Sequence, residues 1–256
     1  MFCQKPGSSR EDVFALWISS LLEKGTPFTL TNSHGRNKDG LKKLGVYTRD
    51  VCRSCNNEWM SRLENKTKPL ISSAILGQPT KWDVSEQETI AAWAFKTALM
   101  LDRSSIAAMK VRPEHFDFLW RQGVPPGSVR IAVAFYRPDD GEALHGFTAG
   151  VGVGEPSIEG AYRIVFSVGH LVFQIHGHAG IDDRGVSVDL WAPSARSGLW
   201  IPLSNTFLPL WRSSGHELEW PTSTGFALNT GSLLALGTQP ITRLGTDPAT
   251  IAAAAA

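Results

Sequence analysis

Two cysteines separated by two residues, Cys52 and Cys55, carry the strongest chemical signal in this sequence. In a C-x-x-C turn both sulfurs can point the same way, so two thiolates can share one Zn²⁺ ion. Thiol redox proteins use the same spacing, between a strand and a helix of a βαβ unit. This region shows no βαβ pattern, and zinc is therefore the favoured interpretation. Two thiolates supply half of a tetrahedral site, so Cys3 and one further group would have to complete it.

A basic cluster lies before and within the cysteine pair. Its members are Arg36, Lys38, Lys42, Lys43, Arg49 and Arg53. Such a cluster can contact the phosphates of nucleic acid, or it can be a solvated face. Because the whole chain has a net charge of only +1, no global positive field attracts nucleic acid, and any binding must come from a local patch.

Two segments resemble the HNH-endonuclease-like family of treble-clef zinc proteins. They are F-C-Q-K-P-G-S-S-R-E, which starts at Phe2, and V-C-R-S-C-N-N-E-W-M-S-R-L-E, which starts at Val51. The resemblance covers about residues 2–66. It implies a structural Zn²⁺ held by Cys3, Cys52 and Cys55, and hydrolysis of phosphodiester bonds in nucleic acid, with DNA favoured. In the family, a His after R-E serves as general base, and the residue after the last Cys can help hold a catalytic metal.

The chain differs from this family pattern at two positions. Cys3 matches the second cysteine of the family's first pair, whose partner would fall just before Met1. Asp12 stands where the family has its general-base His. A carboxylate binds Mg²⁺ well but is a weaker base than imidazole near neutral pH. The resemblance thus implies Asp12 and Asn56 near Mg²⁺ or another divalent cation, His34 as another candidate to activate the nucleophile, and weakened or lost activity.

Less specific interpretations of the same residues stay open. Asp12 could form a capping pair with Ser9 at the start of a helix, and Asn56 could stabilise the turn after Cys55. His34 could be a solvated loop residue. The alternative function is then a catalytically inactive, zinc-stabilised binding or scaffold module, whose β region recognises a protein or nucleic acid.

The elements that must position these residues predict an α+β fold. We expect an HNH-like, treble-clef-like zinc lobe over 1–68, a helical segment over 83–122, an antiparallel β region over 128–246 and a disordered tail over 247–256. Ser85 and Glu88 predict a capping box for the longest helix, and Pro113 and Gly123 bound the next one. Alternation over 170–178 predicts a strand with one apolar face and one half-exposed polar face.

Composition narrows the class of protein further. Hydrophobic residues make up 42% and charged residues 19% of the 256 positions, which excludes disorder over the whole length. Three cysteines are too few for a disulfide scaffold. No apolar run approaches the ~18 residues that cross a bilayer. We therefore expect a soluble cytoplasmic protein with no membrane partner, and the sequence leaves its oligomeric state open.

Overall fold

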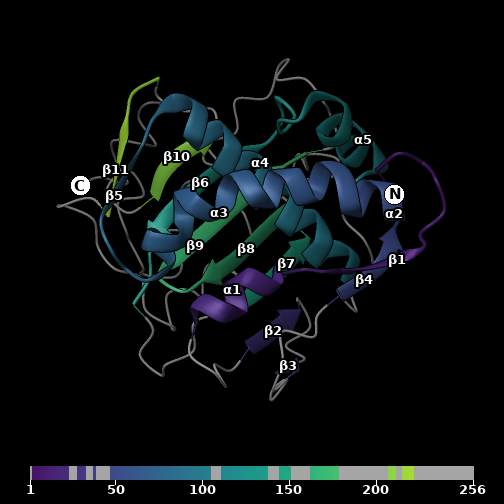
Figure 1. The fold of residues 1–256 in the computed structure, drawn as a ribbon, viewed down its shortest axis with the longest axis horizontal. Coiled ribbons are helices and arrows are strands. Elements are labelled where there is room, and N and C mark those ends of the chain that lie inside the picture. Colours follow the sequence, from purple (N-terminus) through teal and green to yellow (C-terminus); the bar gives the residue numbers. More distant parts are fainter. Residues whose placement is uncertain are drawn as a thin grey trace, which may run out of the picture.

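The protein has an α+β fold, as the sequence predicts (Figure 1). The computed structural model describes residues 2–22, 28–32, 37–38, 47–104, 111–137, 144–150, 162–178, 207–211 and 215–221. Most of the described helical residues belong to the first half of the chain, and strands prevail after residue 129. The predicted tail over 247–256 lies outside the described residues.

A seven-stranded sheet is the largest layer of the described fold. Its strands are β2 (Phe28–Asn32), β3 (Asn37–Lys38), β6 (Arg130–Phe135), β7 (Leu144–Gly150), β8 (Tyr162–Val168), β9 (Leu171–Gly177) and β10 (Phe207–Trp211). Their order across the sheet is β10-β6-β9-β8-β7-β2-β3. Neighbours pair antiparallel except β2 and β7, which run parallel. The antiparallel character predicted for the C-terminal region is confirmed, and β2 and β3 extend its sheet at one edge.

Two short strand pairs accompany this sheet. In the first, β1 (Ser9–Asp12) pairs antiparallel with β4 (Tyr47–Val51). In the second, β5 (Thr80–Trp82) pairs antiparallel with β11 (Leu218–Trp220). Each pair joins segments that are far apart in the sequence, and the first one borders the cysteines.

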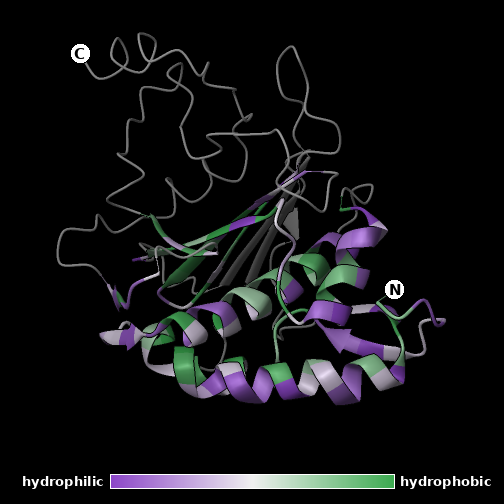
Figure 2. Ribbon diagram, turned by 90° about the horizontal axis from the view of Figure 1, so that it is seen from above, coloured by the Kyte–Doolittle hydropathy of each residue, from purple (hydrophilic) through white to green (hydrophobic). Residues whose placement is uncertain are grey.

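The described helices lie on one side of the large sheet (Figure 2). They are α1 (Leu16–Leu21), α2 (Arg53–Cys55), the π-helical turn η1 (Asn56–Met60), α3 (Ser61–Ile75), α4 (Val84–Ser104) and α5 (Pro113–Gln122). Helix α4 packs against α3 and against the strands of the sheet. Because it is covered on both sides, every residue from 90 to 102 is buried, well beyond the inward stripe that its periodicity predicts.

Aromatic side chains join the helices to the sheet. The ring of Trp93, on α4, lies 5.7 Å from that of Phe173 and 6.2 Å from that of Phe166, both in edge-on contact. Phe14, just before α1, makes a similar contact with Phe166 at 6.1 Å. Edge-on aromatic contacts of this kind stabilise a core beyond the apolar area that they bury. The segment that carries the candidate site residues is thereby packed onto the sheet.

Two helix starts differ from their prediction. Ser9 does not begin a helix, because it lies in β1, where its hydroxyl donates to the carbonyl oxygen of Val51 at 3.0 Å. Pairing with β4 provides hydrogen-bond partners for the backbone of β1, and the helix starts only at Leu16. The capping box of α4 consists of Asp83 and Glu86, whose side chains accept each other's backbone N–H at 2.8 and 2.9 Å, in place of Ser85 and Glu88.

Helix α5 matches its prediction. It begins at Pro113 and ends before Gly123, which adopts the left-handed conformation (φ 71°) typical of a helix C-terminus.

The predicted polar face of β9, in contrast, is not half-exposed. Gln174 and His176 are buried there, and burial, reinforced by the positive charge of Arg163, holds the pKa of His176 well below its ordinary value. None of the described helices is both long enough and apolar enough to cross a membrane.

Candidate metal centre and nucleic-acid surface

The three cysteine side chains converge in space. Sγ of Cys3 lies 3.2 Å from Sγ of Cys52, and all three sulfurs, including that of Cys55, lie within 4.8 Å of one another. Sulfurs that share one tetrahedral Zn²⁺ are expected about 4 Å apart, since each Zn–S bond is ~2.3 Å long. The arrangement can therefore hold a metal ion such as zinc.

Local packing explains why Cys3 reaches a pair that lies 49 residues further along the chain. Phe2 is buried, and its ring lies 4.9 Å from that of Trp59 and 5.5 Å from that of Phe116. Gly7 lets the chain pass β4 closely, because a Cβ at this position would overlap the carbonyl oxygen of Arg49. An aromatic anchor on one side of Cys3 and a close backbone approach on the other place its sulfur at the cluster.

The cysteines differ in their readiness to ionise. Burial acts to raise the pKa of Cys52, but hydrogen bonds from the Ser54 hydroxyl, the Cys55 backbone N–H and the neighbouring thiols lower it to about 6. Burial raises the pKa of Cys55 to about 12, and the nearby thiols add to the increase. Metals bind the thiolate form. Cys52 is thus ready to bind a metal ion, whereas the Cys55 thiol would have to lose its proton when the metal binds.

The donor set fits zinc in its chemistry. Three thiolates occupy three of four tetrahedral positions, and sulfur ligands favour Zn²⁺ over hard cations such as Mg²⁺. Among the described residues, no further His, Cys, Asp or Glu belongs to this cluster. The fourth ligand of a zinc ion at this site would therefore be a water molecule, the nearby Ser54 hydroxyl, which lies 3.2 Å from Sγ of Cys52, or a group outside the described part of the chain.

Asp12 and Asn56, the candidate catalytic residues, both interact with the strand that follows Cys3. The amide nitrogen of Asn56 donates to the hydroxyl of Ser9 at 3.2 Å and to the carbonyl oxygen of Arg10 at 3.0 Å. The carboxylate of Asp12 pairs with the Arg10 guanidinium at 3.2 Å near the surface. Asn56 therefore ties the helix start after Cys55 to β1, and Asp12 is held by a cation on its own strand.

Of the other predicted site residues, the structure describes only some. His34, Arg36, Lys42 and Lys43 lie outside the described residues. For Lys38 the structure describes the backbone, in β3, but not the side chain.

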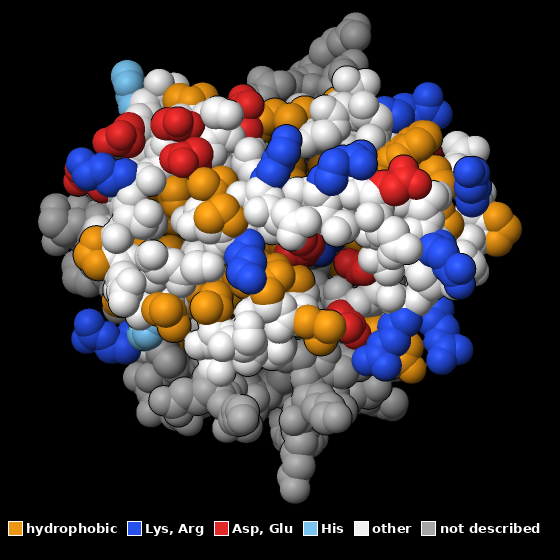
Figure 3. Space-filling model, viewed as in Figure 1, with side chains coloured by type: hydrophobic (Ala, Val, Ile, Leu, Met, Phe, Trp, Pro, Cys, Tyr) orange, Lys and Arg blue, Asp and Glu red, His pale blue; other side chains and the backbone are white. Residues whose placement is uncertain are grey.

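Arg49 and Arg53 are exposed and lie in β4 and at the start of α2, beside the cysteines. Lysine and arginine side chains gather at the end of the molecule where β1, β4 and α2 lie (Figure 3). Arg10, which is also exposed, comes from the same strand pair. The described part of the predicted basic cluster thus forms a surface next to the candidate metal centre.

A second polar centre, which the sequence analysis does not predict, surrounds Lys96 on α4. Its ammonium nitrogen lies 2.5 Å from Oε1 of Glu64 and 3.7 Å from Oε1 of Glu11. Glu64 also accepts hydrogen bonds from the indole nitrogens of Trp93, at 2.9 Å, and Trp17, at 2.8 Å. The side chain of Lys96 has no exposed surface, and those of both glutamates are 13% exposed. We call Glu11, Lys96 and Glu64 the charged cluster.

Electrostatics within the charged cluster oppose desolvation. Burial acts to lower the pKa of Lys96, but the charges of Glu64 and Glu11 outweigh it and raise this pKa, so the ammonium stays charged. Burial raises the pKa of Glu11, and repulsion from Glu64 and Asp12 adds to the increase, while Lys96 acts against it. Glu11 therefore takes up a proton more readily than an exposed glutamate does.

Sequence signals for the charged cluster existed. Glu11 and Glu64 belong to the two segments that resemble the HNH-like family, as the E of R-E and the E of L-E. Lys96 is a charged residue within an apolar helical run, and such a lysine is rarely buried unless it is paired. What the sequence does not indicate is that these three side chains meet.

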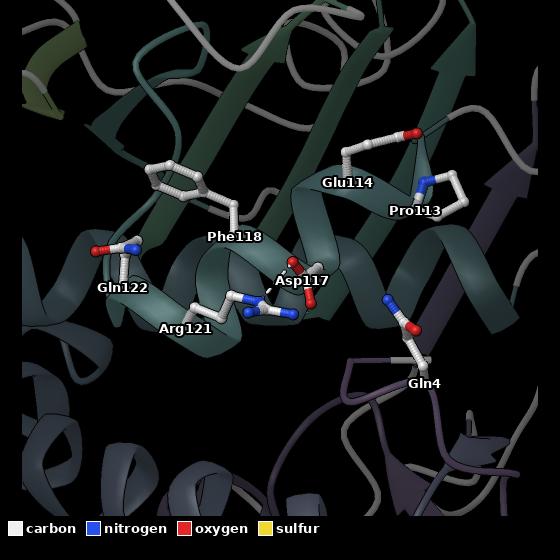
Figure 4. Close-up of a pocket in the computed structure, with 7 residues that line it drawn as sticks. All are labelled: Gln4, Pro113, Glu114, Asp117, Phe118, Arg121 and Gln122. Atoms are coloured by element: carbon white, nitrogen blue, oxygen red, sulfur yellow. Dashed lines mark hydrogen bonds and ion pairs between the residues drawn. The ribbon is translucent and has the colours of Figure 1, made fainter.

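A separate hollow of about 270 Å³ lies between α5 and the N-terminal turn (Figure 4). Gln4 approaches it from the turn, and Asp117 and Arg121 line it from the helix. The guanidinium of Arg121 is paired with the carboxylate of Asp117 at 2.8 Å. The hollow contains none of the predicted site residues, and we assign it no chemistry.

Comparisons with known proteins give no further information about this chain. No protein-family model, curated protein or solved structure matches this chain. The function of this chain is therefore inferred from its residues and their geometry, together with the resemblance of the two cysteine segments.

Proposed function

We propose that this protein is an HNH-endonuclease-like zinc protein that acts on nucleic acid. One observation carries the proposal: the Cys3 sulfur meets those of Cys52 and Cys55. These residues belong to the two segments on which the resemblance rests, and a shared zinc ion would join these segments in addition to their packing. The zinc ion would hold the N-terminal turn, β4 and the start of α2 together.

The basic surface beside the cysteines supports the choice of nucleic acid as partner. Arg10, Arg49 and Arg53 are exposed on neighbouring elements, and arginine contacts phosphate oxygens with two parallel hydrogen bonds. Contacts of this kind give affinity that decreases with salt and carries little sequence specificity. DNA is the favoured substrate class because of the family resemblance.

Hydrolysis is the finer part of the proposal. The carboxylate of Asp12 and the amide oxygen of Asn56 are hard oxygen donors of the kind that Mg²⁺ prefers. We propose that both oxygens would approach one divalent ion, which would polarise a phosphodiester group. Arg10 competes with such an ion for Asp12, and this carboxylate is a weak base, so we expect slow cleavage.

A specific observation favours the alternative function, a zinc-stabilised binding module without catalysis. The amide of Asn56 and the carboxylate of Asp12 already take part in contacts within the protein, to Ser9 and Arg10. These contacts give both residues a structural role without any substrate. The two functions differ in what happens when Asp12 is replaced.

Cleavage of DNA by the full chain, purified with its zinc, separates these functions. We expect Mg²⁺- or Mn²⁺-dependent cleavage that Asp12→Ala abolishes. Asp117→Ala is the matched control, because Asp117 also pairs with an arginine near the surface but lies on α5. If the parent protein cleaves no DNA at any concentration of these metals and still binds it, the binding module is the correct function.

Zinc analysis of the same preparation tests the metal centre. We expect about one zinc per chain, retained through gel filtration. If the purified protein lacks zinc and instead cycles between dithiol and disulfide at Cys52 and Cys55, it is a thiol redox protein and the proposal is wrong.

A further inference from the structure

Tyr47 is an exposed aromatic residue that lies close to two arginines. The Arg10 guanidinium carbon lies 4.2 Å from the centre of the Tyr47 ring, and that of Arg49 lies 5.8 Å from it. Tyr47 is 39% exposed. An exposed ring flanked by guanidinium groups offers a flat surface together with positive charge, which are the two features that bind unpaired nucleotides.

The strand pairing and the ring contacts place these side chains on one face. Asp12 is directly opposite Tyr47 in the β1–β4 register, and the register is irregular between Ser9 and Glu11. Both guanidinium groups contact the Tyr47 ring, so Arg10 and Arg49 lie on the same face as this ring. The other face of this pair carries Glu11, which belongs to the charged cluster, and the buried Thr48. Tyr47, Arg10, Arg49 and Asp12 therefore form the outward face of the β1–β4 pair.

Backbone contacts hold this outward face in place. Asn56 donates to the carbonyl oxygen of Arg10, and Ser9 donates to that of Val51, one residue before Cys52. The face is thus fixed directly to the candidate metal centre. A prearranged ring loses little conformational freedom when a ligand stacks on it.

We propose that the outward face of the β1–β4 pair binds single-stranded nucleic acid, with an unpaired base stacked on Tyr47 and the adjoining phosphates on Arg10 and Arg49. This inference rests on the proposed function and adds to it the form of the substrate.

Charge and shape favour a single strand over a duplex. Asp12 offsets one of the two arginines, so the face carries too little net charge to hold a duplex by its phosphates alone. A base pair within a duplex has both of its faces covered by neighbouring pairs, whereas an unpaired base can stack on an isolated side chain. The ring of Tyr47 therefore contributes to affinity only when a base is unpaired.

Binding of two labelled oligonucleotides to the full zinc-loaded chain tests this proposal. One is a twelve-nucleotide thymidine strand and the other is a hairpin duplex with the same number of phosphates. Fluorescence anisotropy measures the binding of each one without added Mg²⁺. Tyr47→Ala should weaken binding of the single strand by about 5- to 150-fold, the usual effect of losing one stacked base. The hairpin should bind the parent more weakly than the single strand does, and its affinity should change less than about twofold in the variant, because a duplex offers no unpaired base to the ring.

Two further variants make the test specific. Tyr47→Phe keeps the ring and should bind the single strand within about threefold of the parent, since stacking needs no hydroxyl. Trp120→Ala is the matched control: Trp120 is 38% exposed, with the Arg121 guanidinium carbon 5.6 Å from its ring centre, but it lies on α5. It should leave both affinities unchanged. Zinc content and thermal unfolding of each variant verify that the fold is retained.

Three results would contradict the proposal. A folded Tyr47→Ala protein that binds the single strand as tightly as the parent excludes stacking on this ring. An equal loss for strand and hairpin shows a general phosphate surface instead, and in both cases the proposed function still stands. If the parent binds neither oligonucleotide at low salt, the proposed action on nucleic acid fails together with this inference.

Discussion

The cysteine cluster and the charged cluster are two polar centres among buried residues, and they differ in where their cation comes from. The cysteine cluster consists of three thiols within 4.8 Å of one another, with the pKa of Cys52 lowered to about 6, so it could hold a cation from outside the chain. The charged cluster contains its own cation, the ammonium of Lys96, bonded to Glu64 and close to Glu11. The first centre could hold a metal ion from outside the chain, whereas the second contains a cationic side chain of the protein.

This difference indicates two separate ways to stabilise the same small region, by a bound metal ion and by a buried ion pair. A bound metal contributes free energy that disappears when the metal is removed. A buried ion pair cannot be removed by a chelator, but it becomes strongly destabilising when one partner is replaced. The two centres should therefore respond differently to metal removal, to mutation and to pH.

The largest effect is expected at the metal centre. Cys55→Ser should abolish zinc binding and loosen the turn, β1 and β4, because structural zinc in small modules contributes on the order of 10 kcal/mol. The large sheet and α4 should stay folded, so the loss of stability should be only part of that amount. Zinc content and calorimetric unfolding measure both consequences. Ser61→Ala is the control, because Ser61 is exposed at the start of α3, and it should retain zinc; full zinc in Cys55→Ser would exclude this centre.

The next effect concerns the charged cluster. Lys96→Met keeps most of the side-chain volume but leaves two carboxylates without their cation, which should lower the free energy of unfolding by about 3–5 kcal/mol. Zinc content should be unchanged in the folded protein. Urea unfolding measures the loss. Lys81→Met removes a fully exposed lysine from Glu217 and Glu219 and should leave stability unchanged. If Lys96→Met is as stable as this control, the cluster has no stabilising role.

A smaller effect should appear in the pH dependence. The pKa of Glu11 is raised in the folded protein, so folding favours its protonated form, and that contribution is lost as the pH rises through the folded-state pKa. Glu11→Gln cannot ionise and escapes this loss. The stability of the parent relative to the variant should therefore decrease as the pH rises from the ordinary titration range of glutamate towards the folded-state pKa of Glu11. A constant difference in the free energy of unfolding across this range would contradict the assignment.

The smallest effect is expected at the surface. Asp12→Asn removes the ion pair with Arg10, whose side chain is 55% exposed, and exposed pairs of this kind contribute about 0–1 kcal/mol. Urea unfolding should detect little change, in contrast with Lys96→Met. Loss of DNA cleavage in a variant this stable would be a chemical effect. A loss of stability as large as that of Lys96→Met would show that Asp12 is part of the core.

Some features of this protein are readable from local sequence alone. The limits of α5 follow from Pro113 and Gly123, because the backbone preferences of these residues act on their immediate neighbours. The C-x-x-C spacing of Cys52 and Cys55 likewise indicates a shared ligand without any knowledge of the fold. The existence of the long helix α4 follows from its periodicity, although its capping residues do not.

Other features depend on residues that are distant in the sequence. Ser9 and Asp12 have the pattern of a helix start, yet they form a strand, because β4 supplies a partner about 40 residues away. The charged cluster joins residues from three elements, β1, α3 and α4, and no spacing rule relates them. The treble-clef form of the N-terminal lobe and the proposed division of the chain at 68, 83–122 and 128–246 stay predictions.

Residue type and short spacing determined the chemical groups and the local structure of this protein. The groups are a thiolate pair and a basic segment, and the local structure consists of two helices and a sheet of alternating strands. Tertiary structure decided which of these groups meet. It brought Cys3 to Cys52 across 49 residues, turned Glu11 inward towards Lys96, and left Tyr47 exposed close to two arginines. The physical reason is that local preferences act over a few residues of backbone, whereas burial and charge pairing act between any groups that packing places side by side.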